Sequence, residues 1–313
     1  MLDFEKDLIG LDKRIAELKQ LGESGDADFS AEIENLVAKQ RQLAKTVYAS
    51  LTPWQIVQVA RHPQRPGLRD WIERLFSDFL ELHGDRCFGD DDAIIGGFAT
   101  LDKFRLMLIG HQKGKTVEEN MERNFGMGRP EGYRKALRLM KLAEKFSLPV
   151  VCFIDTPGAY PGADAEERGQ AEAIARNILE MTDLKTPILV LVNGEGGSGG
   201  ALGIGAGDVI LMMQYAIYSV ISPEGCASIL WRDGGKAPEA ATALKLTATE
   251  LLDLGIIEDI IPEPPGGAHR DYEATVAAAR PFLLKHLKRL TRMQPTRLVT
   301  HRFEKYAKIG RSK

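Results

Sequence analysis

The first fifty residues carry apolar side chains at helical spacing, interrupted by one polar break at 22–30. The stripe recurs at steps of three and four before the break and again after it, at Leu8, Leu11, Ile15, Leu18 and Leu21, then Ile33, Leu36, Leu43 and Val47. A narrow apolar seam of this kind predicts two antiparallel helices. We expect 1–50 to form a hairpin used for packing and assembly, because no polar groups converge there.

Two helices are expected in 52–84, separated by a basic turn at 61–66, Arg-His-Pro-Gln-Arg-Pro. Thr52, Pro53 and Gln55 form a capping-box pattern with proline at the first helical position. An apolar face then predicts a second helix that Gly84 ends. Its residues are Leu68, Trp71, Ile72, Leu75, Phe76, Phe79 and Leu80.

From Asp90 onward, short apolar runs alternate with amphipathic segments, which is typical of a layered α/β core. The expected strands are 93–100, 105–110, 149–155, 188–193, 208–214, 216–221 and 256–261. The expected helices are 130–146, 165–181 and one starting at 198–205, with a mostly helical C-terminal end. We therefore predict one α/β domain over 51–313 behind the hairpin.

Composition narrows the class of protein. Apolar residues make up 44% of the 313 and charged residues 27%, and the net charge of −3 shows no basic excess for nucleic-acid binding. No signal pattern opens the chain and no uncharged apolar run approaches about 20 residues, so we expect a cytoplasmic protein without a membrane contact. Cys87, Cys152 and Cys226 form no CxxC pair, and the histidines show no ligand spacing, so no metal site is expected in this chain.

Two glycine stretches resemble nucleotide-binding motifs without completing them. Gly110-His111-Gln112-Lys113-Gly114-Lys115-Thr116 has three residues between its glycines, whereas a P-loop has four. Asp155-Thr156-Pro157-Gly158 looks like the magnesium-side motif of GTPases, but the chain has no Asn-Lys-x-Asp. The second stretch is better explained as a strand end whose loop rises over a cleft. A P-loop-like GTPase or ATPase stays as the disfavoured enzyme alternative.

A third stretch, 194–207, contains eight glycines in fourteen residues and follows an apolar strand. It contains G-x-G-x-x-G, but Asp208 comes too early for the acidic residue of a dinucleotide site. The alternative is an oxyanion hole at a helix N-terminus, where Gly199 and Gly200 present unpaired N–H groups. The absence of Cβ lets a ligand oxygen approach these amides.

This glycine pattern resembles the crotonase superfamily, whose members stabilise enolates of acyl-CoA thioesters with two backbone N–H groups. Longer strings resemble the alpha subunits of bacterial acetyl-CoA carboxylase carboxyltransferase. They are Gly110–Gly114, Arg123–Met127, Pro130–Met140, Phe153–Gly162, Glu166–Gln170, Gly194–Gly200 and Ser219–Trp231. The resemblance implies a crotonase-like ββα spiral core, and it is less diagnostic after Asp271.

The resemblance also implies a reaction and its partners. The family transfers the carboxyl group of carboxybiotin, carried on a biotin carboxyl carrier protein, to acetyl-CoA to give malonyl-CoA, the first committed step of fatty acid synthesis. Its alpha subunit pairs with a beta subunit, generally as α2β2, and the zinc ribbon belongs to beta. Amides of Gly199 and Gly200 are then expected to stabilise the biotin enolate oxyanion, while beta supplies the thioester pocket.

The substrate-binding set expected under this resemblance is Gly158, Ala159, Gly197 and Arg134. Gly158 and Ala159 would line the cleft, and Arg134 belongs to a basic helix face that could meet the phosphates of CoA or the acidic face of a partner. Asp155 and Glu195 are expected to be structural carboxylates. A non-catalytic scaffold that uses the hairpin for assembly is the alternative outside the enzymes.

Overall fold

The computed structural model describes residues 2–23 and 28–310. The α-helices are α1 (Lys6–Glu23), α2 (Ser30–Tyr48), α3 (Pro53–Ala60), α4 (Leu68–Leu75), α5 (Val117–Glu122), α6 (Pro130–Lys145), α7 (Ala163–Glu167), α8 (Gln170–Asp183), α9 (Ser198–Gly205), α10 (Pro223–Trp231), α11 (Ala237–Leu244), α12 (Ala248–Asp253), α13 (Tyr272–Leu290) and α14 (Pro295–Lys308). The strands are β1 (Ser77–Glu81), β2 (Ile94–Leu101), β3 (Phe104–His111), β4 (Val150–Thr156), β5 (Ile188–Gly197), β6 (Val209–Met213), β7 (Ile217–Ser219) and β8 (Asp259–Ile261). Short 3-10 helices are η1 (Asp3–Glu5), η2 (Asn124–Gly126) and η3 (Gly234–Lys236).

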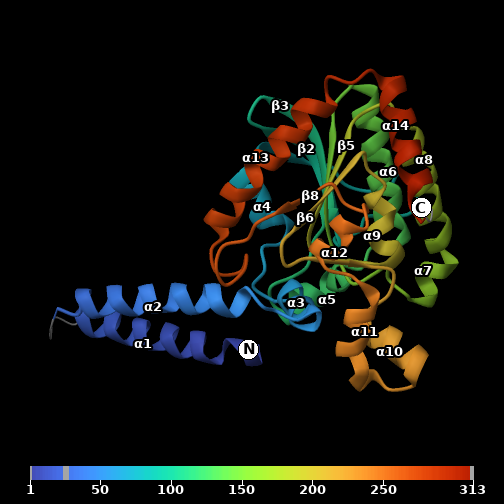
Figure 1. Ribbon diagram of the computed structural model, residues 1–313. Coiled ribbons are helices and arrows are strands. Elements are labelled where there is room, and N and C mark those ends of the chain that lie inside the picture. Colours follow the sequence, from blue (N-terminus) through green and yellow to red (C-terminus); the bar gives the residue numbers. More distant parts are fainter. Residues whose placement is uncertain (1, 24–27, 311–313) are drawn as a thin grey trace.

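One sheet organises the core, in the order β1-β2-β3-β4-β5-β6-β8, and β7 pairs with the end of β5. The first two pairings are antiparallel, and those from β3 to β8 are parallel. Helices α6 and α9 pack on β2–β5, with α8 as a further layer outside them, and α13 contacts β5 and β8. Figure 1 shows these helices flanking the sheet, as expected of a layered α/β protein.

Two predicted helices differ from the structure. The expected helix through Leu80 ends at Leu75, and Phe79 and Leu80 lie in β1, where Ser77 pairs with Thr100 and Leu80 with Phe98. Residues 77–81 are extended because they pair with β2 at the edge of the sheet, although their apolar spacing suits a helix. The spacing of apolar residues within a segment carries no information about a partner strand. The expected helix 165–181 is two helices, α7 and α8, separated at Gly169, whose φ of 83° is left-handed.

A buried ion pair fastens the C-terminal helix to the core. Arg302 of α14 and Asp208 are both fully buried, 2.8 Å apart. The remaining guanidinium hydrogens go to the backbone carbonyls of Leu184 and Thr186, each at 2.9 Å, and of Met181. Asp208 also accepts the N–H of Ile188, the first residue of β5, at 2.7 Å. The charges of Arg302 and Asp208 therefore balance each other, and the guanidinium hydrogens have acceptors inside the core.

The predicted hairpin is confirmed as α1 and α2, which lie side by side as an arm beside the layered core (Figure 1). The middle of the predicted polar break, 24–27, lies outside the described residues. At the base of the arm, Leu8, Ala44 and Tyr48 pack with Val59 and Tyr215 of the domain.

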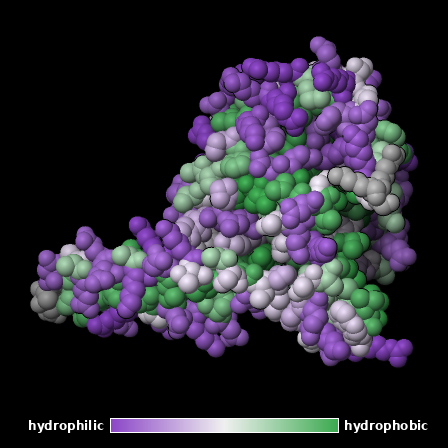
Figure 2. All heavy atoms as spheres, in the orientation of Figure 1, coloured by the Kyte–Doolittle hydropathy of each residue, from purple (hydrophilic) through white to green (hydrophobic). Residues whose placement is uncertain are grey.

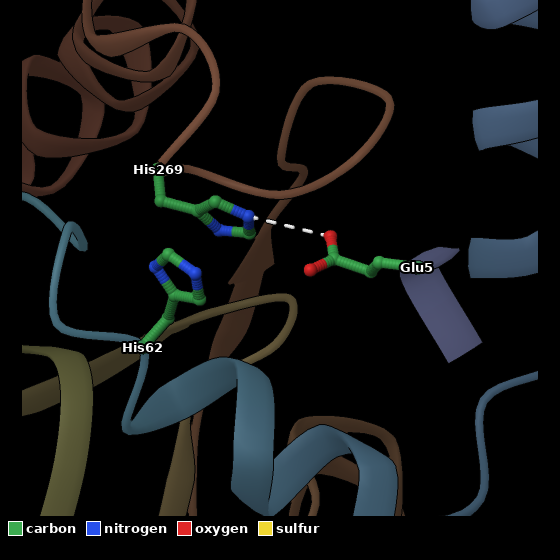
Figure 3. A group of neighbouring side chains, drawn as sticks. All are labelled: Glu5, His62 and His269. Carbon is green, nitrogen blue, oxygen red and sulfur yellow. Dashed lines mark ion pairs between the residues drawn. The ribbon is translucent and has the colours of Figure 1, made fainter. Parts of the chain in front are cut away.

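Polar contacts reinforce this joint. Tyr48 donates to Glu5 at 2.6 Å, and the rings of His62 and His269 stack with centroids 3.9 Å apart, with His269 facing Glu5 (Figure 3). Ligand-type atoms of Glu5, His62 and His269 all lie within 4.8 Å of one another. However, His62 Nδ1 already accepts the N–H of Gln64, and the Arg270 guanidinium lies 3.7 Å from Glu5. We therefore interpret Glu5, His62 and His269 as part of a polar contact that holds the hairpin on the domain.

Hydrophilic side chains cover much of the visible face of the molecule, including the arm (Figure 2). None of the helices in the described part of the chain has the length and apolar character needed to cross a bilayer.

Removing the Arg302 guanidinium should leave Asp208 charged and buried without a partner. We predict that Arg302→Met lowers the free energy of unfolding by about 3–5 kcal/mol, measured by urea denaturation. Arg297→Met, at an exposed position of the same helix, should change it by less than about 0.5 kcal/mol. Equal effects of the two substitutions would contradict the anchoring role.

The hairpin joint should weaken in mild acid. Burial, and then the neighbouring His269, lower the pKa of His62 to about 4, whereas an unfolded histidine titrates near 6.5. Between these values the unfolded chain binds more protons, so stability must fall as pH falls from 7 toward 4. We predict that the melting temperature drops less over pH 7 to 5 in His62→Gln than in the wild type. Parallel pH profiles would show that His62 is not responsible.

Glu5 affects the stability of the protein in a lower pH range than His62 does. Burial alone would raise its pKa, but hydrogen bonds from His269 and Tyr48 outweigh burial and lower it to about 2. Its contribution to stability is therefore complete above the ordinary carboxyl range and is lost as pH falls from about 4.5 toward 2.

Candidate active site

The glycine-rich stretch 194–207 forms a strand end and a helix. Strand β5 continues four residues past its predicted end, because Glu195, Gly196 and Gly197 pair in parallel with β7. Helix α9 then occupies 198–205, as predicted. Ser198 makes the change of direction with a left-handed φ of 50°, an uncommon conformation for a residue with a side chain.

Backbone contact joins the ends of β4 and β5. A Cβ atom on Gly197 would lie 2.1 Å from the carbonyl oxygen of Pro157. A Cβ on Gly200 would lie 2.3 Å from the carbonyl carbon of Gly158 and 2.5 Å from the nitrogen of Ala159. Only glycine fits at both positions. The structure thus brings Gly158, Ala159, Gly197 and Gly200 together, with Gly199 beside them.

The first turn of α9 offers hydrogen-bond donors. Its N-cap is Gly197, which supplies no side-chain acceptor. As residues of the first helical turn, Gly199 and Gly200 have N–H groups with no acceptor four residues back inside α9. Gly199 is open, since a Cβ there would meet only Ile174 at 3.8 Å. The helix dipole adds partial positive charge, so this turn can hold an anionic oxygen.

Side chains beneath α9 fix its position. Tyr133 of α6 donates to the carbonyl of Gly200 at 3.3 Å, and its ring occupies the space where a Cβ on Gly203 would lie. Asn177 of α8 donates to the carbonyls of Tyr133 and Gly203, both at 2.9 Å. Burial lowers the pKa of the nearby His111 to about 4, so its imidazole is neutral at pH 7. Helices α6 and α8 therefore hold α9 and its donors in place.

Charged side chains brace the strand ends from the other side. Asp155 accepts Lys113 Nζ at 2.6 Å and the N–H of Glu195 at 3.0 Å. Glu195 pairs with Arg61 at 2.7 Å, and Arg61 also reaches Glu224 of α10 at 2.6 Å. These contacts support the expectation that Asp155 and Glu195 are structural.

A cavity of about 290 Å³ lies at this edge of the sheet. Its lining includes Lys113, Phe125, Asp155, Pro157 and Glu195. The carboxyl ends of β3, β4 and β5 meet here, which is the common location for ligands in parallel sheets.

The cavity reaches the predicted site only at Pro157; its lining does not include Gly158, Ala159, Gly197, Gly199, Gly200 or Arg134. Arg134 has other contacts. Its guanidinium pairs with Asp85 at 2.7 Å and donates to the carbonyl of Arg168 at 3.0 Å. Asp85 in turn accepts backbone N–H groups of 87–89. The substrate-binding role of Arg134 stays a prediction, and we assign its present contacts to bracing the loop before β2.

In the P-loop-like segment 110–116, Lys115 makes contacts within the protein. Lys115 pairs with Asp70 and lies over the ring of Tyr272 at 5.4 Å. A Cβ on Gly114 would lie 2.4 Å from the backbone nitrogen of Asn120, so the glycine allows close packing against α5. These contacts give no support to the nucleotide-hydrolysis alternative.

Sequence reasoning did not identify the Arg61–Glu195 pair or Tyr133 as parts of the site. The basic turn at 61–66 was visible, but its partner lies 134 positions away. No local pattern marks such a contact. For Tyr133 the available signal was a large aromatic residue on one predicted helix and a run of glycines on another.

The fold matches solved carboxyltransferases and decarboxylases. A crystal structure of the transcarboxylase 12S hexamer with methylmalonyl-coenzyme A bound has a TM-score of 0.56 at 19% identity, covering 72% of this chain and 44% of that one. A Pseudomonas malonate decarboxylase hetero-tetramer in complex with coenzyme A has a TM-score of 0.59 at 15% identity, covering 76% and 94%. At these identities the likeness establishes the fold alone, and it confirms the predicted crotonase-like core.

Sequence similarity is much closer within one family. The acetyl-coenzyme A carboxylase carboxyl transferase subunit alpha of Geobacillus sp. (strain WCH70) is 57% identical over 309 residues, covering 99% of this chain and 95% of that protein. A family model described as acetyl co-enzyme A carboxylase carboxyltransferase-like matches residues 1–310. The chain therefore belongs to the family of acetyl-coenzyme A carboxylase carboxyltransferase alpha subunits.

Proposed function

We propose that this chain is the alpha subunit of the carboxyltransferase component of acetyl-CoA carboxylase. It transfers the carboxyl group of carboxybiotin to acetyl-CoA, giving malonyl-CoA for fatty acid synthesis. Family membership over nearly the full length supports the activity. The place of Gly199 and Gly200 in the first turn of α9, beside the close contact of Gly197 and Gly200 with 157–159, supports the location of the site.

The donors of α9 suit this chemistry. Carboxybiotin brings the carboxyl group, and negative charge develops on the ureido oxygen of biotin when that group leaves. The N–H groups of Gly199 and Gly200 donate to that oxygen, because they belong to the first turn of α9, at its positive end. Preorganised donors of this kind lower the barrier without reorganising during the reaction. No side-chain nucleophile is needed.

The chain works with other subunits. The relatives' name designates an alpha subunit, which implies a partner subunit. We infer an α2β2 assembly in which beta carries the thioester pocket and the zinc ribbon, with biotin arriving on a carrier protein in the cytoplasm. The hairpin 1–50 serves assembly in this arrangement, and 51–313 forms the carboxyltransferase domain.

An apolar surface lies where a partner would cover this site. Val220 and Ile229 are 74% and 72% exposed, and Leu230 and Trp231 are also exposed. Figure 2 shows apolar side chains over the region of α10 and α11, at the lower right. Ser219, next to Val220, pairs with Gly197 of the site. Exposed apolar surface of this kind marks an interface, and we assign it to the beta subunit.

The proposal predicts activity only in the mixed complex. The chain with the beta subunit should carboxylate free biotin at the expense of malonyl-CoA, whereas the chain alone should not. Ile229→Lys should raise the concentration of beta needed for half-maximal activity by about tenfold, since a charge replaces an apolar contact. Full activity of the isolated chain would refute a shared site, and inactivity of the wild-type mixture would refute the proposed function.

A methyl group at Gly200 should disrupt the site itself. It would force 158–159 away from α9, so the donors would lose their alignment. In the same assay, we predict that Gly200→Ala lowers kcat by about 100-fold or more. Gly10→Ala, in α1 where a Cβ meets nothing within 4 Å, should leave kcat unchanged. Melting curves and beta binding identify misfolding, and near-wild-type turnover by a folded Gly200→Ala complex would contradict the assignment.

A further inference from the structure

The turn before α6 holds an aromatic side chain in a strained position. Asn124, Phe125 and Gly126 all have left-handed backbone angles, with φ of 45°, 57° and 78°. Glycine adopts this region freely and asparagine tolerates it, but a bulky residue rarely does. The ring of Phe125 is nevertheless 49% exposed. Folding therefore gains little from burying this ring, although the backbone beneath it is strained.

Contacts on both sides hold the turn in place. A Cβ on Gly126 would lie 2.9 Å from Lys113 Cγ and 3.0 Å from the carbonyl oxygen of Asp155, so the turn packs closely on the end of β4. Gly126 donates to the carbonyl of Arg123 at 2.8 Å, and Met127 to that of Asn124 at 2.9 Å. Strain that persists in such a rigid setting is typical of ligand-binding sites.

The same turn is connected to the loop that carries Gly158 and Ala159. Tyr160 donates its N–H to the carbonyl of Gly128 at 3.0 Å, and Arg129 stacks over the Tyr160 ring at 4.6 Å. Phe125 and Pro157 line the same cavity. Pro157 directly precedes Gly158, so the cavity that Phe125 lines borders the segment leading into that loop.

We propose that Phe125 provides a stacking face for the fused ring system of biotin. This inference rests on the proposed function and adds a binding residue to it. The cavity, about 290 Å³, is at the lower limit of small-ligand pockets, roughly 300–1,000 Å³. It accommodates a ring system but not a whole coenzyme A. A position beside Pro157 selects the carboxyl donor over the distant adenine of CoA, and an aromatic face can stack on a compact ring. The rest of the lining is mostly polar or charged, as Lys113, Asp155 and Glu195 are, which suits a ring that carries a polar ureido group.

Kinetics with two substrates test this assignment. The complex with beta is assayed for malonyl-CoA-dependent carboxylation of free biotin, with each substrate varied in turn. Phe125→Gly removes the ring and also adopts the turn's backbone angles without strain. We expect its KM for biotin to rise about tenfold, as for the loss of one stacked face, with KM for malonyl-CoA unchanged. Phe125→Trp restores a flat face and should return KM for biotin to near the wild-type value.

Stability measurements separate binding from a structural role. If the strain serves binding, Phe125→Gly should melt at the same or a higher temperature than the wild type, whereas a structural ring would make it melt lower. Phe303→Ala, which removes another exposed phenylalanine on α14, should leave both KM values unchanged.

Several outcomes would overturn the inference. They are an unchanged KM for biotin in Phe125→Gly, a rise in KM for malonyl-CoA instead, an equal loss in Phe125→Trp, or a lower melting temperature of Phe125→Gly. If the wild-type complex is active and Phe125→Gly behaves like it, this inference alone fails. If the wild-type complex is inactive, the proposed function fails and this inference fails with it.

Discussion

The structure of the site depends on backbone contact between the segments that follow β4 and β5. Gly197 meets Pro157, and Gly200 meets Gly158 and Ala159, at distances that leave no room for a Cβ atom. This contact sets where α9 begins relative to the loop 157–162, and therefore where the amides of its first turn lie. Steric exclusion is a sharper constraint than any one hydrogen bond here, because a single methyl group at either position requires the segments to separate.

Both ends of β5 are held by carboxylates that accept its backbone amides. Asp208 accepts the N–H of Ile188 at the start, and Asp155 accepts that of Glu195 near the end. Each carboxylate is paired with a cation, Arg302 and Lys113 respectively. The strand that leads into α9 is thus fixed at both ends by charge-assisted hydrogen bonds. Such rigidity suits a site that works by preorganised donors instead of moving side chains.

Local signals predicted much of the framework. The start of α9, the capping box of α3 and the two hairpin helices follow from helical spacing, caps and glycine placement. The helix predicted through Leu80 was wrong, because β1 is defined by a partner strand that local spacing does not contain. The central glycines of the site were identified because a motif shared with a family marks them. Arg61, Tyr133 and Phe125 were not, because their roles arise from contacts or backbone angles set by distant parts of the chain.

The central claim is that the amides of Gly199 and Gly200 hold an oxygen of the carboxyl donor. Nuclear magnetic resonance of the chain labelled with 15N-glycine, in complex with unlabelled beta subunit, tests it during titration with biotin. The account predicts that the amide protons of Gly199 and Gly200 move downfield as hydrogen bonds form, while that of Gly10 in the arm stays in place. Saturation with biotin without movement of these two amides, or movement confined to other glycines, would contradict it.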